Sequence, residues 1–496
     1  MPCHKRRLSK RAGERAMNVQ RPSVGPIIGY TTSNEVRIWL RGKLQKTDDE
    51  GYNRCFGVVQ LKGPKDKDWV QAPRFVKMPP HFDMTGVCVF TGLLPETDYE
   101  YRAGWFYAET EMDNLGPNLK LDWEGISPKP FRTGTAKKTA GRSYAIGSCR
   151  YLLRLFGGSF FDDRGDKAFR SILEQIEDPK SPRPVDGLLM VGDQVYADDL
   201  NFVGPDTQVD EYLKRYREVF SQPHLARLMS RVPTYMVLDD HEIEDNWPAK
   251  ATDKDRHTLY PAAMHAYQIY QCSHGPVFPL GSDGSIEGTL SRFWYTFEDG
   301  CCDWFVLDCR TERVWDTDPS RRKMVKDDQL RALLKWLDDG SGAAKMIVSS
   351  VPFFPDLESD NDDKWGGFPW ERTQILDFIV SRKIRKVAFV SGDVHCSFVS
   401  ELTCTSDPSF KVHSIVSSSF FWPYPHMEAS DFVLKGELRT ASSPKATTAN
   451  KYQVSYTSKV HSTDNFCRLE VDPAGFQVTY YERKGAPLGK PVVRQW

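Results

Sequence analysis

The chain has 496 residues, of which 40% are hydrophobic and 12% aromatic, and its 66 basic and 67 acidic side chains give a net charge of -1. This length and composition suffice for a sizeable core in two or three domains, which excludes global disorder. The balanced charge excludes a general electrostatic footprint for nucleic acid and leaves room only for a local basic patch.

The N-terminal segment predicts neither a secretory signal nor a membrane anchor. Residues 1–25 are basic, but the apolar segment that a secretory signal requires does not follow them. We expect a solvated tail over these residues, with a truncated or alternative start, or an organelle address, as the alternatives. No window of the chain approaches the ~20 continuous apolar residues of a membrane span.

The eleven cysteines favour a reducing compartment. Their number is odd and their spacing irregular, only Cys301 and Cys302 are adjacent, and no CxxC pair occurs. This pattern is typical of buried reduced thiols and not of a disulfide framework. We therefore expect a cytoplasmic location.

Short strands of alternating polarity are predicted from about residue 26 to residue 135. The clearest are separated by turn residues and lie at 35–42, 53–63, 86–94 and 98–107. Many short strands with turn signals and no helical period are typical of an all-β sandwich. The stretch 91–105, in which a proline turn leads into an aromatic strand, resembles an immunoglobulin or fibronectin module. Small, polar and basic residues at 136–143 predict a linker.

From residue 144 to residue 496 the pattern changes to that of an α/β domain. Apolar runs that end in polar clusters cover residues 144–150, 187–196, 233–242, 345–354 and 385–395. Helical patterns between them cover residues 166–178, 209–229, 327–339 and 370–383. In sheets built this way, ligands gather at the carboxyl ends of the strands. Residues 466–483 predict a final antiparallel hairpin with its turn at Asp-Pro-Ala-Gly.

Four polar clusters mark these strand ends. They are Ser148-Cys149-Arg150, residues 192–196, Asp239-Asp240-His241-Glu242 with Asp245 and Asn246, and residues 392–395. A single strand-end aspartate usually caps a helix or pairs with a cation, and a lone histidine or cysteine there is usually a core residue. Several converging carboxylates, by contrast, would repel one another and raise their pKa values unless a cation neutralised them. The combination therefore predicts one or more bound metal ions.

The order of these motifs resembles that of a known superfamily. GDxxY at 192–196, DDHE at 239–242 and GDVH at 392–395 look like the metallophosphoesterases, and specifically their alkaline phosphatase D-like, or PhoD-like, branch. Residues 303–313, 363–376 and 387–397 strengthen a match that covers essentially the whole chain. The resemblance implies an α/β fold class: a metallophosphoesterase-like β-sandwich flanked by helices at 144–496, preceded by a small all-β immunoglobulin/fibronectin-like domain at 26–135.

Departures from the wider superfamily bear on the metals. Cys149 stands in GSCR where an Asp-x-His pair is usual, Ser350 stands where a histidine is usual, and GDVH replaces Gly-His-x-His. The loss of imidazoles and the gain of aspartate, tyrosine and cysteine favour harder cations, and Fe3+ is a natural partner of phenolate and thiolate. The resemblance likewise implies iron and calcium as cofactors, with other divalent metals as the alternative.

The resemblance also implies which residues hold the metals. Cys149, Asp193 and Tyr196 are expected to hold the iron, and Asp193 to bridge toward calcium. The remaining expected ligands are Asp240, Asn246, Asp393 and His395.

Three residues are expected to take part in catalysis: Asp193, His241 and Arg150. By its place in the motif, His241 would orient the phosphate or protonate the leaving oxygen. Arg150 would bind phosphate oxygens, because its forked donors suit their geometry.

Several neighbours of the motifs are expected to be structural. Asp198 and Asp199 would cap the next segment, and Asp239 would orient His241 or a backbone turn. Asp245 stands where we expect asparagine, which leaves Asn246 as the usable ligand.

Ordinary packing or pairing is also expected further along the chain. Asp308, Arg310 and Arg313 would form an ion-pair cluster, with contact between Arg310 and substrate as the alternative. Trp365 and Trp370 would pack in the ordinary way or wall the cleft. Structural or surface positions are expected for His81, His224, His257 and His265.

The predicted function is metal-dependent hydrolysis of phosphoester substrates, of alkaline phosphatase or phosphodiesterase type. The resemblance implies that a metal-bound hydroxide or oxygen attacks phosphorus in line. The alternatives are a non-catalytic binding or scaffold protein of the same fold, and a phosphodiesterase for lipid or nucleotide substrates. Substrate choice is expected to lie in loops such as 151–166 and 420–450, and the oligomeric state is left open.

Overall fold

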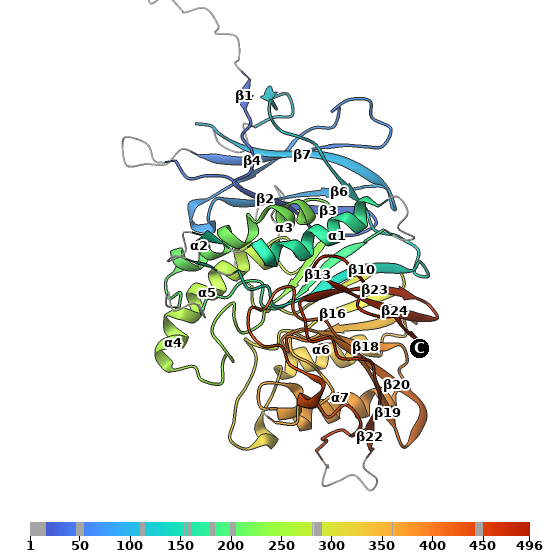
Figure 1. Cartoon of the computed structure of the whole chain (residues 1–496). Helices are drawn as coiled ribbons and strands as arrows, with labels where there is room; N and C mark the ends of the chain where they lie inside the picture. The colour runs from blue at the N-terminus through green and yellow to red at the C-terminus, as the bar shows by residue number, and fades with distance from the viewer. Residues whose placement is uncertain are drawn as a thin grey trace, which may run out of the picture.

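The computed structural model describes most of the chain. Described are residues 16–45, 54–109, 115–152, 163–178, 184–198, 205–279, 281, 290–359, 361–441 and 450–496, with the backbone of residues 154–155 and 160–161. Sheets stack on one another along the long direction of the molecule, with helices between and beside them (Figure 1).

Two antiparallel sheets form the N-terminal part. One has the order β2 (Val24–Thr31), β3 (Glu35–Arg41), β6 (Thr85–Thr91). The other has the order β5 (Arg74–Lys77), β4 (Cys55–Lys62), β7 (Asp98–Tyr107), β9 (Lys129–Arg132). Alternate residues of β3 point inward, so Val36, Ile38 and Leu40 enter a core that both sheets share. The strands predicted here are present, whereas the domain division and the immunoglobulin/fibronectin-like character stay predictions.

The predicted N-terminal tail differs from the structure at its inner end. Residues 1–15 lie outside the described residues, but β1 (Met17–Asn18) pairs with β8 (Leu121–Asp122), and Val19 is buried. Two apolar residues, Met17 and Val19, anchor this part of the segment. The overall basic composition of residues 1–25 therefore did not indicate a buried strand.

Two larger sheets follow and pack face to face. The first has the order β14 (Thr234–Val237), β13 (Gly187–Val191), β10 (Arg142–Gly147), β23 (Asn465–Asp472), β24 (Gly475–Glu482), β25 (Val492–Gln495). The second has the order β15 (Tyr295–Asp299), β16 (Cys302–Val306), β17 (Ala344–Val348), β18 (Val387–Ser391), β20 (Asp407–Val416), β19 (Phe398–Cys404), β22 (Tyr452–Thr457), β21 (Gly436–Glu437). Ile146 and Val191 of the first sheet share a core with Trp304 and Val390 of the second.

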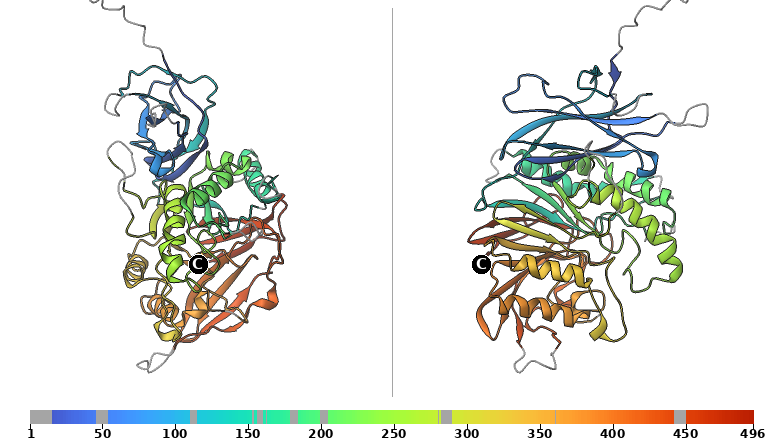
Figure 2. Two further views of the ribbon diagram at one scale, coloured as in Figure 1. Left: turned by 90° about the vertical axis from the view of Figure 1, so that its left-hand side faces the viewer. Right: turned by 180° about the vertical axis from the view of Figure 1, so that it is seen from behind.

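Helices cover the outer face of each large sheet. The first sheet is covered by α1 (Lys167–Glu177), α2 (Val209–Phe220), α3 (Pro223–Met229) and α5 (Leu259–Tyr267). The second is covered by α6 (Asp327–Leu337) and α7 (Pro369–Ser381). The two groups lie on opposite sides of the sandwich (Figure 2). Strands β13, β17 and β18 are therefore buried on both faces, which explains their uninterrupted apolar runs.

The remaining elements are short. They are α4 (Asp253–His257), β11 (Arg154–Leu155), β12 (Phe160–Phe161), and the turns η1 (Pro80–Phe82), η4 (Asp163–Asp166), η5 (Gln268–Cys272), η6 (Pro319–Arg321), η7 (Trp365–Gly367) and η8 (Ala429–Asp431).

Two predictions about elements have clear outcomes. The hairpin at 466–483 is confirmed, since β23 and β24 pair from Asn465 with Glu482 to Asp472 with Gly475. The single helix predicted at 209–229 is wrong, because it divides into α2 and α3. Pro223 disfavours helical geometry in the residue before it, and Gln222 is extended, with φ -62° and ψ 132°.

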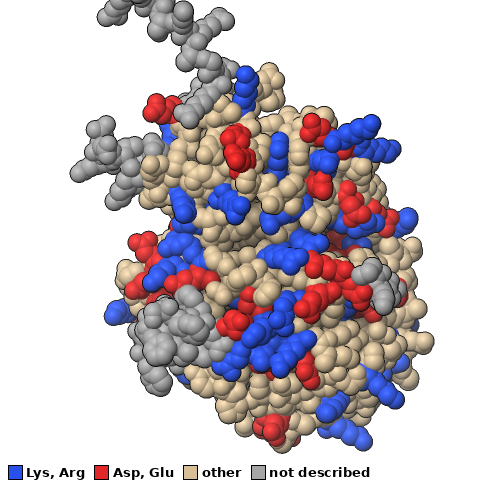
Figure 3. Space-filling view, turned by 45° about the horizontal axis from the view of Figure 1, so that its top comes forward, with Lys and Arg blue, Asp and Glu red and all other residues tan. Residues whose placement is uncertain are grey.

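The surface and the cysteines bear on location and partners. Within the described residues, no helix combines the length and apolarity needed to cross a membrane. All ten described cysteines are free and buried. On the face seen in Figure 3, basic and acidic side chains lie interspersed. The cytoplasmic location and the absence of a nucleic-acid partner stay predictions.

Candidate metal centre

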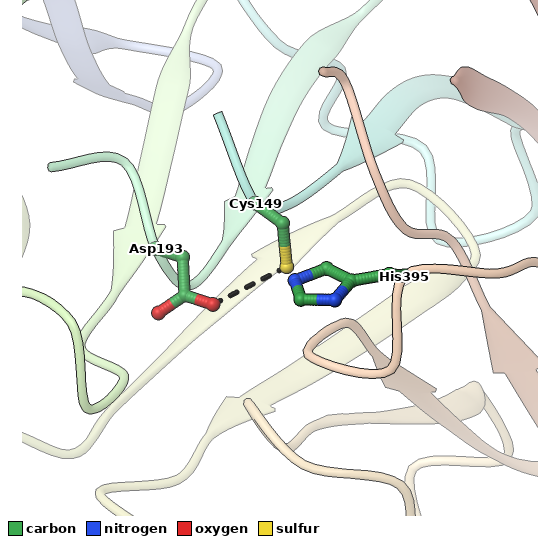
Figure 4. A group of neighbouring side chains, drawn as sticks. All are labelled: Cys149, Asp193 and His395. Atoms are coloured by element: carbon green, nitrogen blue, oxygen red, sulfur yellow. Dashed lines mark hydrogen bonds between the residues drawn. The ribbon is translucent and has the colours of Figure 1, made fainter. Parts of the chain in front are cut away.

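The four polar clusters meet at one edge of the sandwich. They follow the last residues of β10, β13, β14 and β18, whose carboxyl ends come together there. Three groups of side chains each have ligand atoms within 4.8 Å of one another: Cys149/Asp193/His395, Asp193/Asp240/His241 and Asp239/Asp240/Asp393. Figure 4 shows the side chains of the first group pointing toward one another. The sequence order of the motifs thus becomes one continuous site.

The backbone at the site is held in an uncommon conformation. Cys149, Asp193, Asn246, Asp393 and His395 have φ values of 53°, 55°, 58°, 69° and 48°. Such left-handed geometry is costly for residues other than glycine and concentrates at functional sites. Here the left-handed geometry turns the backbone sharply at each of these five positions.

Cys149 and Tyr196 form a buried corner of the site. The Cys149 Sγ lies 3.2 Å from the Asp193 Oδ2, and the Ser418 hydroxyl donates to it over 3.1 Å. Burial, and then the negative charge of Asp193, raises the pKa of the Cys149 thiol well above its usual value. Burial likewise raises the pKa of the Tyr196 hydroxyl. A bound cation would reverse both shifts, because it favours the ionised ligand.

The residues present fit a metal ion. Among the described residues, the Asp193 Oδ1, the Tyr196 hydroxyl and the His395 Nε2 are buried without a hydrogen-bonding partner. Buried polar atoms without partners are uncommon and costly, so several at one point fit the coordination of a bound ion. Their mixed oxygen, nitrogen and sulfur donors, together with Cys149, suit a transition metal.

An ionic cluster borders the centre on its other side. The Arg310 guanidinium lies 2.5 Å from the Asp239 Oδ1 and 2.6 Å from the Asp363 Oδ1. The Lys364 Nζ lies 2.5 Å from the Asp393 Oδ2 and 2.9 Å from the Asp363 Oδ2. Arg310 thus offsets the charge of Asp239 and Asp363, and Lys364 offsets that of Asp363 and of the expected ligand Asp393.

His241 is held by a carboxylate. Its Nδ1 lies 2.6 Å from the Asp198 Oδ2, which also accepts the backbone N–H of Asp245 over 3.1 Å. Burial lowers the pKa of His241, but Asp198, Asp240 and Asp193 outweigh it and raise that pKa well above its usual value. The His241 ring packs on Tyr196 with ring centroids 4.3 Å apart. The imidazole thus has one fixed orientation.

Comparison with known proteins agrees with this geometry. A family model described as PhoD-like phosphatase matches residues 156–479. The chain belongs to the PhoD-like phosphatase family. The predicted resemblance is confirmed.

Individual relatives show how far the likeness extends. Alkaline phosphatase D of Bacillus subtilis (strain 168) is 27% identical over 217 residues, which cover 39% of this chain and 36% of the relative. The chain thus aligns with little more than a third of that relative's length. A solved structure of PhoD matches 96% of this chain and 89% of its own, with a TM-score of 0.67 and 16% identity. The purple acid phosphatase PPD1 from yellow lupin (Lupinus luteus) seeds matches 95% of this chain and 74% of its own, with a TM-score of 0.57 and 13% identity. The mixed α/β fold of PhoD and the purple acid phosphatase is therefore also the fold of this chain.

The Arg150 side chain lies away from the candidate centre, which corrects the predicted phosphate contact. Its side chain has no exposed surface and lies over the Phe169 ring at 5.3 Å. The Arg150 Nη1 donates to the Val219 carbonyl, and the Nη2 lies 3.7 Å from the Asp166 Oδ1. Cys149 points into the centre, whereas the Arg150 side chain packs against Phe169 of α1 and Val219 of α2.

One predicted capper, Asp198, and one predicted ligand, Asn246, have other contacts. Asp198 orients His241, as described above, instead of capping a segment, and Asp199 lies outside the described residues. The Asn246 side-chain amide donates to the Asp245 Oδ2 over 2.8 Å, and its backbone N–H donates to the Asp240 Oδ2 over 2.6 Å. Asn246 is thus next to the proposed ligand Asp240, and its own ligand role stays a prediction.

The predicted ion-pair cluster has different members. Arg310 and Arg313 both pair with Asp363, whereas Asp308 accepts the backbone N–H groups of Arg310 and Thr311. Arg310 has no exposed surface, and its Nη2 lies 3.3 Å from the Asp240 Oδ1, so its contact with substrate stays a prediction. Asp239 binds Arg310 and so does not orient His241.

Of the two tryptophans that were expected either to pack in the ordinary way or to wall the cleft, Trp365 packs in the ordinary way. Trp365 is fully buried and donates its Nε1 hydrogen to the Ser349 hydroxyl. Trp370 is 36% exposed at the start of α7. Four histidines outside the motifs belong to none of the three ligand groups found among the described residues. They are His81, His224, His257 and His265.

Sequence reasoning missed two residues that shape the centre. The buried Glu242 accepts the backbone N–H groups of Asp193, Gln194 and Asp239, and so ties two of the ligand loops together. Lys364 brings an ammonium group to Asp393. The place of Glu242 beside His241 in the DDHE motif could have indicated its role at the site. For Lys364, the sequence offered only its position between Asp363 and Trp365 in a stretch that the family resemblance includes.

Proposed function

We propose that the chain is a metal-dependent phosphoester hydrolase that acts on phosphomonoesters or phosphodiesters. The observation that carries the proposal is the convergence of Cys149, Asp193 and His395, with Tyr196 beside them, around polar atoms that lack hydrogen-bonding partners among the described residues. Membership of the PhoD-like phosphatase family supports the same reaction class.

Iron and calcium are the metals that we propose for the site. Cys149, Tyr196 and Asp193 would hold Fe3+, because thiolate and phenolate suit that ion, and His395 lies within reach of the same point. Asp240, Asp393 and Asn246 would offer oxygen atoms to calcium, with Asp193 shared. Bound cations supply Lewis acidity, which stabilises charge on the phosphoryl oxygens and favours ionisation of the attacking water.

His241 would contact the reacting phosphoryl group. Because Asp198 occupies the Nδ1, the Nε2 is left to face a phosphoryl or leaving oxygen. A carboxylate that fixes the ring orientation in this way keeps the working nitrogen in place during the reaction.

Lys364 would bind phosphate oxygens, which is the role that was expected of Arg150. Its side chain is 16% exposed, and its ammonium group sits between Asp363 and Asp393, next to the proposed ligands. An ammonium group there can bind a phosphoryl oxygen as a point charge.

The test is turnover by the purified full chain, before and after treatment with a chelator. We expect hydrolysis of a simple aryl phosphate or of its diester, loss of that activity after chelation, and its return when iron and calcium are restored together. Activity that survives full removal of the metals would contradict metal dependence. No turnover of either ester by metal-loaded protein would favour the non-catalytic binding or scaffold protein.

A further inference from the structure

A cluster of four aromatic rings lies beside the proposed centre, and the proposed reaction uses only one of them. We call Tyr151, Tyr196, Trp422 and Tyr424 the aromatic cluster. Trp422 stacks on the ring of His395 with centroids 3.8 Å apart and planes at 18°. Tyr196 packs on His241 at 4.3 Å. The cluster therefore touches two of the site imidazoles directly.

The cluster runs from the buried centre to the surface. Tyr151 and Tyr196 are 2% and 5% exposed, Trp422 is partly buried, and Tyr424 is 41% exposed. The ring centroid of Tyr424 lies 5.0 Å from that of Trp422 and 6.2 Å from that of Tyr151. Tyr424 is thus the outermost ring of a continuous aromatic surface that begins at the ligands.

Backbone contacts hold the cluster in place. The Tyr151 N–H donates to the Phe421 carbonyl over 3.1 Å, which joins the segment after β10 to the segment after β20. The Trp422 N–H donates to the Asp464 Oδ1 over 2.9 Å. A fixed ring surface can bind a planar group at little cost in conformational entropy.

The direction in which the ester group of a bound substrate points determines whether the aromatic cluster can affect substrate choice. The inter-sheet core, Asp239 and Arg310 are buried, so a phosphoryl group bound at the centre would extend its ester group away from them, toward solvent. Trp422 and Tyr424 lie on the exposed side. Stacking on such rings favours planar π systems over aliphatic groups of the same size.

We propose that Trp422 and Tyr424 form a subsite for a planar aromatic ester group, either an aryl ring or a nucleobase. This inference rests on the proposed phosphoester hydrolysis and gives it a substrate preference. The shared chemistry is an uncharged, flat π face carried on the leaving alcohol.

The test compares matched substrate pairs. Adenosine 5′-phosphate is paired with ribose 5-phosphate, and benzyl phosphate with cyclohexylmethyl phosphate. Both members of each pair release a primary alcohol, so leaving-group reactivity is matched and the ratio of their kcat/KM values reports the ring. We expect the ring-bearing member to be preferred by about tenfold. A preference in the nucleotide pair alone would identify the nucleobase as the ligand, and a preference in both pairs a general π face.

Variants of the exposed ring locate the preference. Tyr424→Ala should remove most of it, and Tyr424→Phe should keep it, because the ring and not the hydroxyl is used. Trp370→Ala is the matched control, since that ring has a similar exposed fraction, 36%, at the start of α7. Equal kcat/KM values within both pairs, or a preference that Tyr424→Ala leaves intact, would overturn the proposal.

A binding measurement separates this proposal from the proposed function. If no phosphoester is hydrolysed, the proposed function has failed, and calorimetric titration with adenosine and with ribose still probes the subsite. Adenosine that binds more tightly than ribose to the unmodified chain, and about tenfold less tightly to Tyr424→Ala, would support it. Equal weak binding of both compounds would contradict it.

Discussion

The ligand loops are tied to one another as well as to their strands. The Cys149 N–H donates to the Gly192 carbonyl, and the Arg150 N–H donates to the Asp193 carbonyl over 2.8 Å. These bonds help to offset the cost of the left-handed backbone at Cys149 and Asp193, which is on the order of 1–3 kcal/mol per residue. The backbone thus places the thiol and the carboxylate before any metal binds.

Asp193 should be one of the two most sensitive ligands, because its carboxylate, like that of Asp240, belongs to two of the three groups. Asp193→Ala is expected to lower kcat/KM by at least about 10²-fold, toward background. The measurement is steady-state hydrolysis of an aryl phosphate, with circular dichroism to verify folding. Asp186→Ala, which alters a carboxylate outside the centre that pairs with Arg142, is the control. Turnover within twofold of the unmodified chain would refute the assigned role.

Asp198 should act on the reaction through His241. Asp198→Asn keeps the size of the side chain but changes which imidazole nitrogen carries hydrogen, so kcat should fall by roughly 10²- to 10⁴-fold. Iron and calcium contents should stay unchanged, which separates orientation from loss of metal. Asp98→Asn, which alters an exposed carboxylate that pairs with Arg132 in the N-terminal part, serves as control. An unaltered kcat in Asp198→Asn would show that His241 needs no such partner.

At this scale the sequence reveals residue types better than side-chain directions. The motifs brought Cys149, Asp193 and His395 to one point because parallel strands end at one edge. Arg150 could not be assigned correctly, since its direction depends on the geometry of a single strand end. Asp198 and Lys364 gain their roles from partners far away in sequence, which spacing does not reveal.

Among the elements, α7 carries a buried carboxylate that links it to the segment before α6. Glu371 accepts the backbone N–H groups of Met324 and Val325 over 2.6 and 3.4 Å, and burial raises its pKa to about 7. The folded state therefore binds this proton more tightly than the unfolded state does. The stability that it contributes is fully present below about pH 4.5 and is lost as the pH rises to about 7.

Glu371→Gln should remove this pH dependence. Between pH 5 and pH 8 the unmodified chain should lose about 2–3 kcal/mol in the free energy of unfolding more than the variant does. Urea denaturation of both proteins at the two pH values measures the difference. Identical pH dependence in the two proteins would show that Glu371 has no raised pKa.

Element types were easier to predict than their arrangement. Apolar runs identified β13, β17 and β18, because strands covered on both faces contain few polar residues. The antiparallel pair of β19 with β22 could not be predicted, since residues 405–451 separate the two strands and such distant pairing leaves no local periodic signal.

In the whole molecule, the N-terminal sheets are packed against the helices that support the centre. The Trp39 Nε1 donates to the Ile269 carbonyl over 3.1 Å, and the Tyr30 N–H donates to the His274 carbonyl over 2.8 Å. Between these contacts, the Gln271 side chain donates to Glu242, which organises the ligand loops. The N-terminal part thus supports the site through η5.

Gly29 is the point of closest approach in this contact. A Cβ atom there would lie 2.2 Å from the His274 carbonyl oxygen, a distance that the packed backbone cannot accept. Gly29→Ala should therefore lower the free energy of unfolding by about 1–3 kcal/mol. Gly116→Ala is the control, since nothing lies within 4 Å of its added carbon. Thermal unfolding measures both, and an equal Tm for the two variants would contradict this account of the contact.

The most direct test of the central claim is the amount of iron bound per chain. Elemental analysis of the purified full chain should find close to one iron, and much less in Cys149→Ala, because the thiolate is a proposed ligand. Cys404→Ala, which removes a buried cysteine outside the centre, should keep the iron of the unmodified chain. Iron at background in the unmodified chain, or unchanged iron in Cys149→Ala, would contradict the proposed centre.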